Sequence, residues 1–221
     1  LVSKLKYSLT LSLVSLVFAF AVSIPIGIFG AVRRGSSEDR SITTALFMLY
    51  SLPSFFIASL LLYFLSEGSN WPILRIFPTG GFQSIDHGDL TTLGKVVDIL
   101  WHLVLPVACL THGYFAVLSR YMRTGLLEVI GFDYVRTARA KGLPEHVVIG
   151  KHALRNGLLP IFTLLGSLLP TVLGGSVVIE YIFGIPGIGA LTVNSIYQRD
   201  YNVIMGVQLM TTVLVLVGML I

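Results

Sequence analysis

The chain has 221 residues, of which 54% are hydrophobic and only 12% are charged. Ordinary soluble domains carry roughly 25% charged residues, so the composition indicates a membrane protein and argues against a soluble globular domain. The net charge of +4 comes from Lys and Arg residues that lie between apolar runs. This placement is explained by membrane topology, so the charge does not require a nucleic-acid partner.

Five apolar runs contain no Asp, Glu, Lys or Arg. They cover residues 7–32, 41–66, 99–119, 156–179 and 201–221. Each run reaches the roughly 20 residues that a helix needs to cross a bilayer. We therefore predict an all-α, polytopic transmembrane helical bundle with five spans, forming a single membrane domain over residues 1–221.

The distribution of Lys and Arg predicts the orientation of these spans. With alternate gaps on the same side, one side holds ten Lys and Arg residues and the other holds five. Because the richer side is usually cytoplasmic, we predict a cytoplasmic loop at about 120–156 and external loops at about 67–98 and 180–202. The first residue is then external without a cleavable signal before it. We therefore expect a fragment of a longer protein with six spans.

The first two spans contain expected helix irregularities. The first ends in SIPIGIFGAVRRGSSEDR, where Pro25 and Gly30 should loosen the helix before a short turn. A turn this short makes the first two spans antiparallel neighbours. In the second span, Pro53 of YSLPSFF predicts a kink, and the hydroxyl of Ser51 or Ser54 could satisfy the backbone groups that the proline frees.

The third and fourth spans carry further packing signals. Pro106 predicts a kink in the third span, and Trp101 is expected at its membrane interface. The fourth span has two rows of small residues and proline at i, i+4 spacing: Gly166, Pro170 and Gly174, and Ser167, Thr171 and Gly175. Such rows favour close helix packing, with a pathway-lining role as the alternative.

The basic segment between the third and fourth spans predicts two short helices joined by a turn. Asp133 is the expected N-cap of a helix through Lys141, and Gly142 suits the left-handed position that follows. Pro144 and Glu145 then suit the first turn of a second, amphipathic helix. Such a segment could be a lever for a partner protein or a surface segment that neutralises anionic lipid headgroups, and its pattern leaves both open.

Several motifs together resemble one transporter family. YVRTARAKGL, the HALRN that follows, VVIEYIFGIPGIGALTVNSI and RDY, together with PIGIFGAVRRGSSEDR and SLPSFF, resemble the inner-membrane permease subunit of ABC importers of the dipeptide and oligopeptide class. Nickel and glutathione importers belong to the same class, so the substrate stays open. The resemblance implies the ABC importer permease fold and a multi-pass protein of a bacterial or archaeal cytoplasmic membrane.

The resemblance further implies that the basic segment is a coupling segment that docks on an ATP-hydrolysing subunit. The wider importer pattern has Glu-Ala-Ala where this chain has Arg136, Thr137 and Ala138, a departure that fits the peptide branch. The residues implied for coupling are Asp133, Tyr134, Arg136, Thr137, Ala138, Arg139, Ala140, Lys141, Gly142, Leu143, His152 and Arg155.

The segment EYIFGIPGIGALT is implied to lie outside the spans, on the external side. Its glycines around a proline permit tight turns, so the segment is either a simple turn or an external gate. The candidate gate residues are Glu180, Phe183, Pro186, Gly187 and Gly189.

The sequence offers no catalytic motif. Lys95 and Lys151 follow glycines but precede Val and His, where a phosphate-binding Walker loop needs Ser or Thr. His102 and His112 could bind a metal, although a hydrogen bond between helices is favoured. The single cysteine, Cys109, can form no internal disulfide. We therefore expect no enzyme activity and no cofactor on this chain, with ATP and Mg on separate ATPase subunits.

Taken with the resemblance, these features predict a permease subunit of an ATP-driven importer that moves peptides or similar small solutes by alternating access. The implied partners are a second homologous permease, two ABC ATPase subunits, an external solute-binding protein and membrane lipid. The alternatives are a secondary carrier driven by an ion gradient and a membrane scaffold that transports nothing. The spans lack the buried charges common in ion-coupled carriers, which favours the ATP-driven importer.

Overall fold

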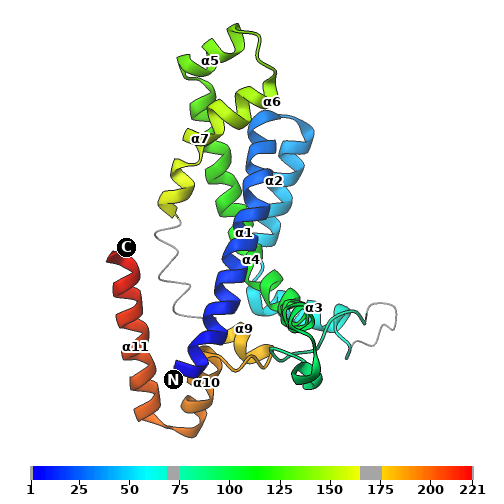
Figure 1. Cartoon of the computed structure of the whole chain (residues 1–221), viewed down its shortest axis with the longest axis vertical. Helices are drawn as coiled ribbons and strands as arrows, with labels where there is room; N and C mark the ends of the chain where they lie inside the picture. Colours follow the sequence, from blue (N-terminus) through cyan, green and yellow to red (C-terminus); the bar gives the residue numbers. More distant parts are fainter. Residues whose placement is uncertain (1, 69–74, 165–175, 221) are drawn as a thin grey trace. The chain divides into compact units, whose positions relative to one another are not determined.

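The computed structural model describes residues 2–68, 75–164 and 176–220, and nearly all of the secondary structure in these ranges is helical (Figure 1). The helices are α1 (Val2–Val32), α2 (Ser37–Tyr50), α3 (Ser54–Leu65), η2 (Ile85–Asp89), α4 (Thr92–Ile130), α5 (Asp133–Ala140), α6 (Glu145–Val147), η3 (Val148–Ala153), α7 (Leu154–Gly157), α9 (Val177–Ile182), α10 (Ile188–Gln198) and α11 (Tyr201–Leu220). This confirms the predicted all-α fold class.

The described residues form helices over four of the five predicted runs, and two or three of these qualify as membrane spans. Over these residues, α1 and α4 are each long and apolar enough to cross a membrane, and α2 with α3 makes a third span if the broken pair counts as one. The fifth run forms the apolar helix α11. The middle of the fourth run, residues 165–175, lies outside the described residues and contains both of its rows of small residues.

Pro53 breaks the second run into two helices. Because proline has no N–H and disfavours a helical conformation in the residue before it, α2 ends at Tyr50 and α3 begins after Pro53, which is its N-cap. The Ser51 hydroxyl donates to the carbonyl oxygen of Met48 at 2.7 Å. A serine hydroxyl thus satisfies a backbone group at the break, as predicted. In contrast, Pro25 and Pro106 both lie inside continuous helices, α1 and α4.

Helix α4 is longer than the apolar run that predicted it. The run covers residues 99–119, whereas α4 has 39 residues, from Thr92 to Ile130. Charged residues end an apolar run but do not end a helix, since Lys and Arg are good helix formers. Residues 92–98 and 120–130 are therefore helical where the sequence suggested loops.

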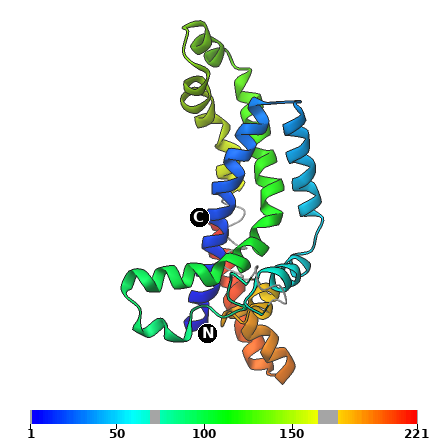
Figure 2. The ribbon, with the colours of Figure 1, turned by 90° about the vertical axis from the view of Figure 1, so that its right-hand side faces the viewer.

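The chain divides into two compact units. The first unit contains Leu1–Phe18, Leu52–Thr111 and Leu169–Ile221, and the second contains Ala19–Ser51 and His112–Leu168. In the second unit, the C-terminal parts of α1 and α4 run alongside α2, while α5 and α6 lie at the same end as the turn between α1 and α2 (Figure 1 and Figure 2). Both basic segments that the charge pattern assigned to the cytoplasm thus meet at one end of this unit.

Each unit has its own apolar core. In the first unit, helices α3, α4 and α9 contribute buried side chains such as Ala58, Leu103 and Ile179, and the Tyr7 ring packs edge-on against Phe82 with 4.8 Å between centroids. In the second unit, the core joins α1 and α4 to the short helices α5, η3 and the residues after α7: Ala31, Met122, Leu126, Val129, Val135, Ala138, Val148, Ile149, Ala153 and Ile161.

Candidate coupling segment and external loop

The first arm of the basic segment is α5, which begins one residue earlier than predicted. The N-cap is Phe132, in extended conformation, so Asp133 is the first helical residue and not the cap. Its carboxylate still lies in the first turn, where the helix dipole favours negative charge. The helix ends at Ala140, with Lys141 as its C-cap.

The turn between the arms follows the predicted chemistry. Gly142 has a φ of +76°, a left-handed conformation that costs glycine little. Pro144 is the N-cap of α6, because its carbonyl oxygen accepts hydrogen bonds from the amides of Val147 and Val148, and Glu145 is the first helical residue. The chain therefore leaves one helix and enters the next within four residues.

The second arm is not the single α-helix that the sequence suggested. After the three residues of α6, residues Val148–Ala153 form a π-helical turn before α7 begins at Leu154. A π-helical turn is wider than an α-helical one, and this one leaves Val148, Ile149 and Ala153 all buried. The predicted amphipathic character is confirmed, since Lys151 and Arg155 are exposed and His152 is half-buried.

Three contacts hold the two arms against each other. Val135 and Ala138 of α5 belong to the same buried cluster as Val148 of the second arm. At the open end, the side-chain amide of Asn156 donates to the hydroxyl of Tyr134 at 2.9 Å. At the turn, a two-bond ion pair closes the hairpin.

That ion pair joins Arg139 to Glu145 across the Gly142 turn. The guanidinium donates to both carboxylate oxygens, at 2.6 and 3.1 Å. These hydrogen bonds from Arg139 hold the pKa of Glu145 below its ordinary value. Both side chains are substantially exposed, so the pair contributes little to the free energy of folding, although it joins the two sides of the turn.

The predicted coupling residues separate into an inner and an outer set. Ala138 is buried, and Arg139 is engaged by Glu145. His152 is half-buried, and the remaining predicted side chains are exposed: Asp133, Tyr134, Arg136, Thr137, Ala140, Lys141, Leu143 and Arg155, beside the turn residue Gly142. The only bond that Arg136 makes within the described residues is a long contact of 3.9 Å to Asp133. The outer set is therefore a basic, solvent-facing surface on a fixed helical hairpin.

The external segment is built around the carboxylate of Glu180. One of its oxygens, Oε2, accepts hydrogen bonds from the amides of Gly189 at 2.7 Å and Ala190 at 3.2 Å. The Ser8 hydroxyl accepts a third bond, from the amide of Ile188 at 2.8 Å. These are the first three amides of α10, which have no partner inside the helix. Glu180 is fully buried and serves as the cap of α10.

Two glycines make this cap sterically possible. A Cβ on Gly187 would collide with the Glu180 carboxylate and the Ser8 hydroxyl, and one on Gly189 would lie 2.5 Å from the Cα of Val177. Phe183 is also buried, and its carbonyl oxygen accepts a hydrogen bond from the amide of Gly81 at 2.7 Å. Of the five candidate gate residues, only Pro186 is partly exposed. The Glu180 carboxylate thus makes hydrogen bonds within the external loop.

Several contributing residues were not found from the sequence. Ser8 lies in an apolar run and Gly81 in a turn-rich loop, and neither has a local signal that points to α10 or Phe183. The contact between Asp39 and Arg123 was also not found from the sequence. Arg123 donates hydrogen bonds to both carboxylate oxygens of Asp39 and to the carbonyl oxygen of Gly30. Only the last pair had a detectable signal, since each charge lies just beyond an apolar run.

The histidines of the first unit pair with a carboxylate. His102 Nδ1 lies 2.9 Å from the carbonyl oxygen of Asp98, and His87 Nδ1 lies 2.6 Å from its Oδ2. The Ser84 hydroxyl also donates to this carboxylate. Across the part of the chain that the structure describes, no group of three or more His, Cys, Asp or Glu residues could hold a metal ion.

A helical chain with candidate membrane spans and a basic helical hairpin fits a transport permease, and comparison with known proteins supports this class. The family described as "Binding-protein-dependent transport system inner membrane component" matches residues 23–221. The chain belongs to this family, which confirms the resemblance drawn from its motifs.

Curated relatives cover the whole chain. It is 42% identical over 221 residues to the oligopeptide transport system permease protein AppB of Bacillus subtilis, covering 100% of this chain and 67% of that protein. It is 36% identical to the dipeptide transport system permease protein DppB of Escherichia coli K12, covering 100% and 68%. A putative peptide permease of Brucella ovis is 40% identical, covering 94% and 62%. The chain thus spans about two thirds of the length of these relatives.

A solved structure shares the fold. The chain is similar to a chain of the inward-facing MetNI methionine ABC transporter, with a TM-score of 0.73, 19% identity, and coverage of 98% of this chain and 90% of that one. At this identity, the likeness bears on the fold alone.

Proposed function

We propose that the chain is the permease subunit of an ATP-driven importer that moves peptides or similar small solutes across the cytoplasmic membrane by alternating access. ATP and Mg bind to two separate ATPase subunits, a second permease completes the pathway, and an external solute-binding protein delivers the solute. Peptide is the proposed substrate class because the similar curated proteins are named as oligopeptide and dipeptide permeases.

The observation that carries this proposal is the hairpin of residues 133–156. A lever must not deform under load, and this one is held at its turn by Arg139 and Glu145, at its open end by Tyr134 and Asn156, and between by a buried apolar contact. Its outer face leaves Arg136 and Lys141 for a partner. Movement of an ATPase subunit would therefore be transmitted to the core of the second unit.

Two other functions make different predictions. An ion-coupled carrier would keep transporting without ATP and stop when the ion gradient is removed, whereas the proposed importer does the reverse. A scaffold would show no solute uptake in liposomes under either condition. Within the described residues, Oε2 of the fully buried Glu180 accepts hydrogen bonds from two amides of α10, a capping role that does not require ion coupling.

A cysteine crosslinking scan tests the proposal. Single cysteines replace Arg136, Lys141, Pro144 and Lys151, all of which are exposed, in the full-length protein co-expressed with its ABC ATPase subunit. We expect crosslinks to the ATPase that change in yield when ATP is added. The native Cys109 is buried, so it should give little background.

Ala138 provides a matched control within the same helix. It lies on α5 beside the scanned positions but faces the core of the unit, so Ala138→Cys should not crosslink. The absence of crosslinks at all four exposed positions, in an inserted and assembled complex, would refute the coupling role and leave the hairpin as a lipid-surface segment. Equal crosslinking at Ala138 would show that the yields report non-specific contact.

A further inference from the structure

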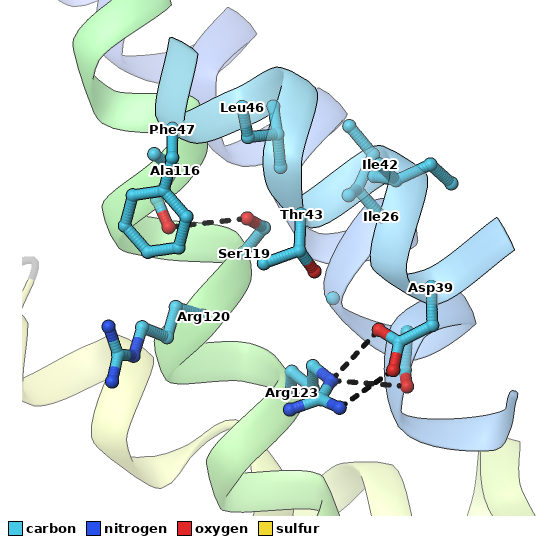
Figure 3. Close-up of a pocket in the computed structure, with 12 residues that line it drawn as sticks. Ile26, Asp39, Ile42, Thr43, Leu46, Phe47, Ala116, Ser119, Arg120 and Arg123 are labelled. Carbon is cyan, nitrogen blue, oxygen red and sulfur yellow. Dashed lines mark hydrogen bonds and ion pairs between the residues drawn. The ribbon is translucent and has the colours of Figure 1, made fainter. Parts of the chain in front are cut away.

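The second unit contains a cleft, between α1, α2 and α4, that the coupling mechanism does not use. It has a volume of about 260 Å³, and its walls are largely apolar, with Ile26 from α1, Ile42 and Leu46 from α2, and Ala116 from α4. Two guanidinium groups, of Arg120 and Arg123, line it at one end (Figure 3). The cleft therefore combines an apolar body with a cationic end.

The two arginines are in different electrostatic states. Arg123 is neutralised by Asp39, with hydrogen bonds of 3.1 and 2.7 Å to the two carboxylate oxygens. Arg120 takes part in no ion pair among the described residues, and its guanidinium lies over the Phe47 ring, 5.8 Å from the centroid. Figure 3 shows Arg120 separated from the Arg123–Asp39 pair, and the Thr43 side chain projecting toward Arg123. Arg120 thus supplies an uncompensated positive charge at the cleft.

A second cleft continues from the first at Arg120. Its volume is about 550 Å³, and it shares Phe47, Ala116 and Arg120 with the first cleft while adding Tyr50 and Val117. The exposed fractions are 44% for Phe47, 54% for Tyr50 and 36% for Val117. These apolar surfaces belong to the runs 41–66 and 99–119, so they lie at the depth of the acyl chains, and Arg120 immediately follows the second of these runs.

The position of the cleft along the membrane normal follows from the charge pattern. The cleft lies at the end of the second unit that carries the turn between α1 and α2, which the positive-inside tendency assigns to the cytoplasmic side. The cytoplasmic leaflet of a membrane presents anionic headgroups, and basic pockets between helices on this side are suited to bind them. An apolar cleft that leads to Arg120, which has no ion pair within the described residues, matches the two parts of such a lipid.

We propose that the two clefts form one binding site for an anionic phospholipid of the cytoplasmic leaflet. The phosphate and charged headgroup pair with Arg120, and an acyl chain lies along Phe47, Tyr50, Ala116 and Val117. The site does not depend on the substrate that the chain transports. The lipid would brace α2 against α4 beside the hairpin that follows α4.

Retention of lipid by the purified protein tests this proposal. The full-length permease, in complex with its ATPase, is reconstituted with equal amounts of phosphatidylglycerol and phosphatidylethanolamine, released into mild detergent, and analysed by native mass spectrometry. We expect preferential retention of phosphatidylglycerol by the unmodified protein. Arg120→Gln should lower that preference about five-fold, since one arginine near a membrane surface has about this effect on anionic lipid, and inorganic phosphate should not displace the lipid.

Arg34→Gln is the matched control. Arg34 lies in the exposed turn at the same end of the unit, lines neither cleft, and loses the same charge on substitution, so this variant should keep the preference. An equal loss in both variants would show diffuse surface attraction and overturn the site, as would an unchanged preference in Arg120→Gln.

The apolar part of the site is tested by a photoreactive benzoylphenylalanine at Val117. We expect it to crosslink to phospholipid in the membrane. Crosslinking to another polypeptide instead would show that protein covers this groove and would overturn the proposal.

Discussion

The coupling hairpin and the external loop share a local sequence pattern but are stabilised in different ways. Each has a helix, a glycine with positive φ, an aliphatic residue and a proline before the next helix: Gly142-Leu143-Pro144 in one and Gly184-Ile185-Pro186 in the other. Leu143 is exposed, whereas Ile185 is fully buried. A local pattern thus determines that the chain turns, but not whether the turn faces a partner or the protein core.

The polar contacts of the hairpin and the external loop also differ in their exposure to solvent. The hairpin is closed by the exposed pair Arg139 and Glu145, while the external loop is closed by the buried carboxylate of Glu180 on the amides of α10. An exposed ion pair can be broken at little cost, but a buried amide that loses its acceptor cannot turn to water. The external loop should therefore tolerate substitution far less than the hairpin.

Removal of the buried cap should have the largest effect. Glu180→Ala leaves the amides of Gly189 and Ala190 without an acceptor, and we expect a loss of about 3 kcal/mol in the free energy of unfolding. Denaturant unfolding of the purified protein in detergent measures it. Glu128→Ala removes an exposed carboxylate and should change stability by less than about 0.5 kcal/mol. Similar effects of the two variants would contradict the capping role.

A methyl group at Gly189 should have the next largest effect. Its Cβ would lie 2.5 Å from the Cα of Val177, so the backbone must shift, and we expect Gly189→Ala to cost about 2 kcal/mol. Gly150 in the hairpin is the control, because a Cβ there meets nothing within 4 Å. Gly150→Ala should leave the thermal midpoint nearly unchanged, and a matching fall at both positions would remove the distinction between the two regions.

Gly142→Val tests the turn of the hairpin. The φ of +76° is disfavoured for a residue with a Cβ, so the variant should cost ~1–2 kcal/mol locally. If the hairpin transmits movement, solute uptake per ATP hydrolysed should fall while membrane insertion is unchanged. Uptake and ATPase assays in proteoliposomes measure this ratio, and normal coupling would argue against the turn as a mechanical element.

The Arg139–Glu145 pair should give the smallest effect and a defined pH dependence. Because Arg139 lowers the pKa of Glu145, the stabilisation is complete above the ordinary pKa of glutamate and is lost as the pH falls through the lowered value. We expect Glu145→Gln to cost about 0.5 kcal/mol at neutral pH, less once the pH falls below the ordinary glutamate pKa of about 4.3, and nothing in acid below the lowered pKa of Glu145. Thermal midpoints of both proteins at the two pH values measure it; a difference that persists in acid would have another cause.

The sequence by itself determined the features that depend on neighbouring residues. Runs without charge predicted the spanning helices, Pro53 predicted the break between α2 and α3, and Gly142 predicted the left-handed turn. The motifs also identified the family. Such features follow from backbone propensities and from the cost of burying charge in lipid, both of which act within a few residues or along one helix.

Only the tertiary structure decided the contacts between distant parts of the chain. Ser8 caps a helix 180 residues away, and Arg123 pairs with Asp39 across 84 residues. The π-helical turn at Val148–Ala153 likewise accompanies the burial of three apolar side chains in the core of the second unit. A hydrogen bond between distant residues depends on how helices pack, and no local pattern in a single sequence specifies that packing.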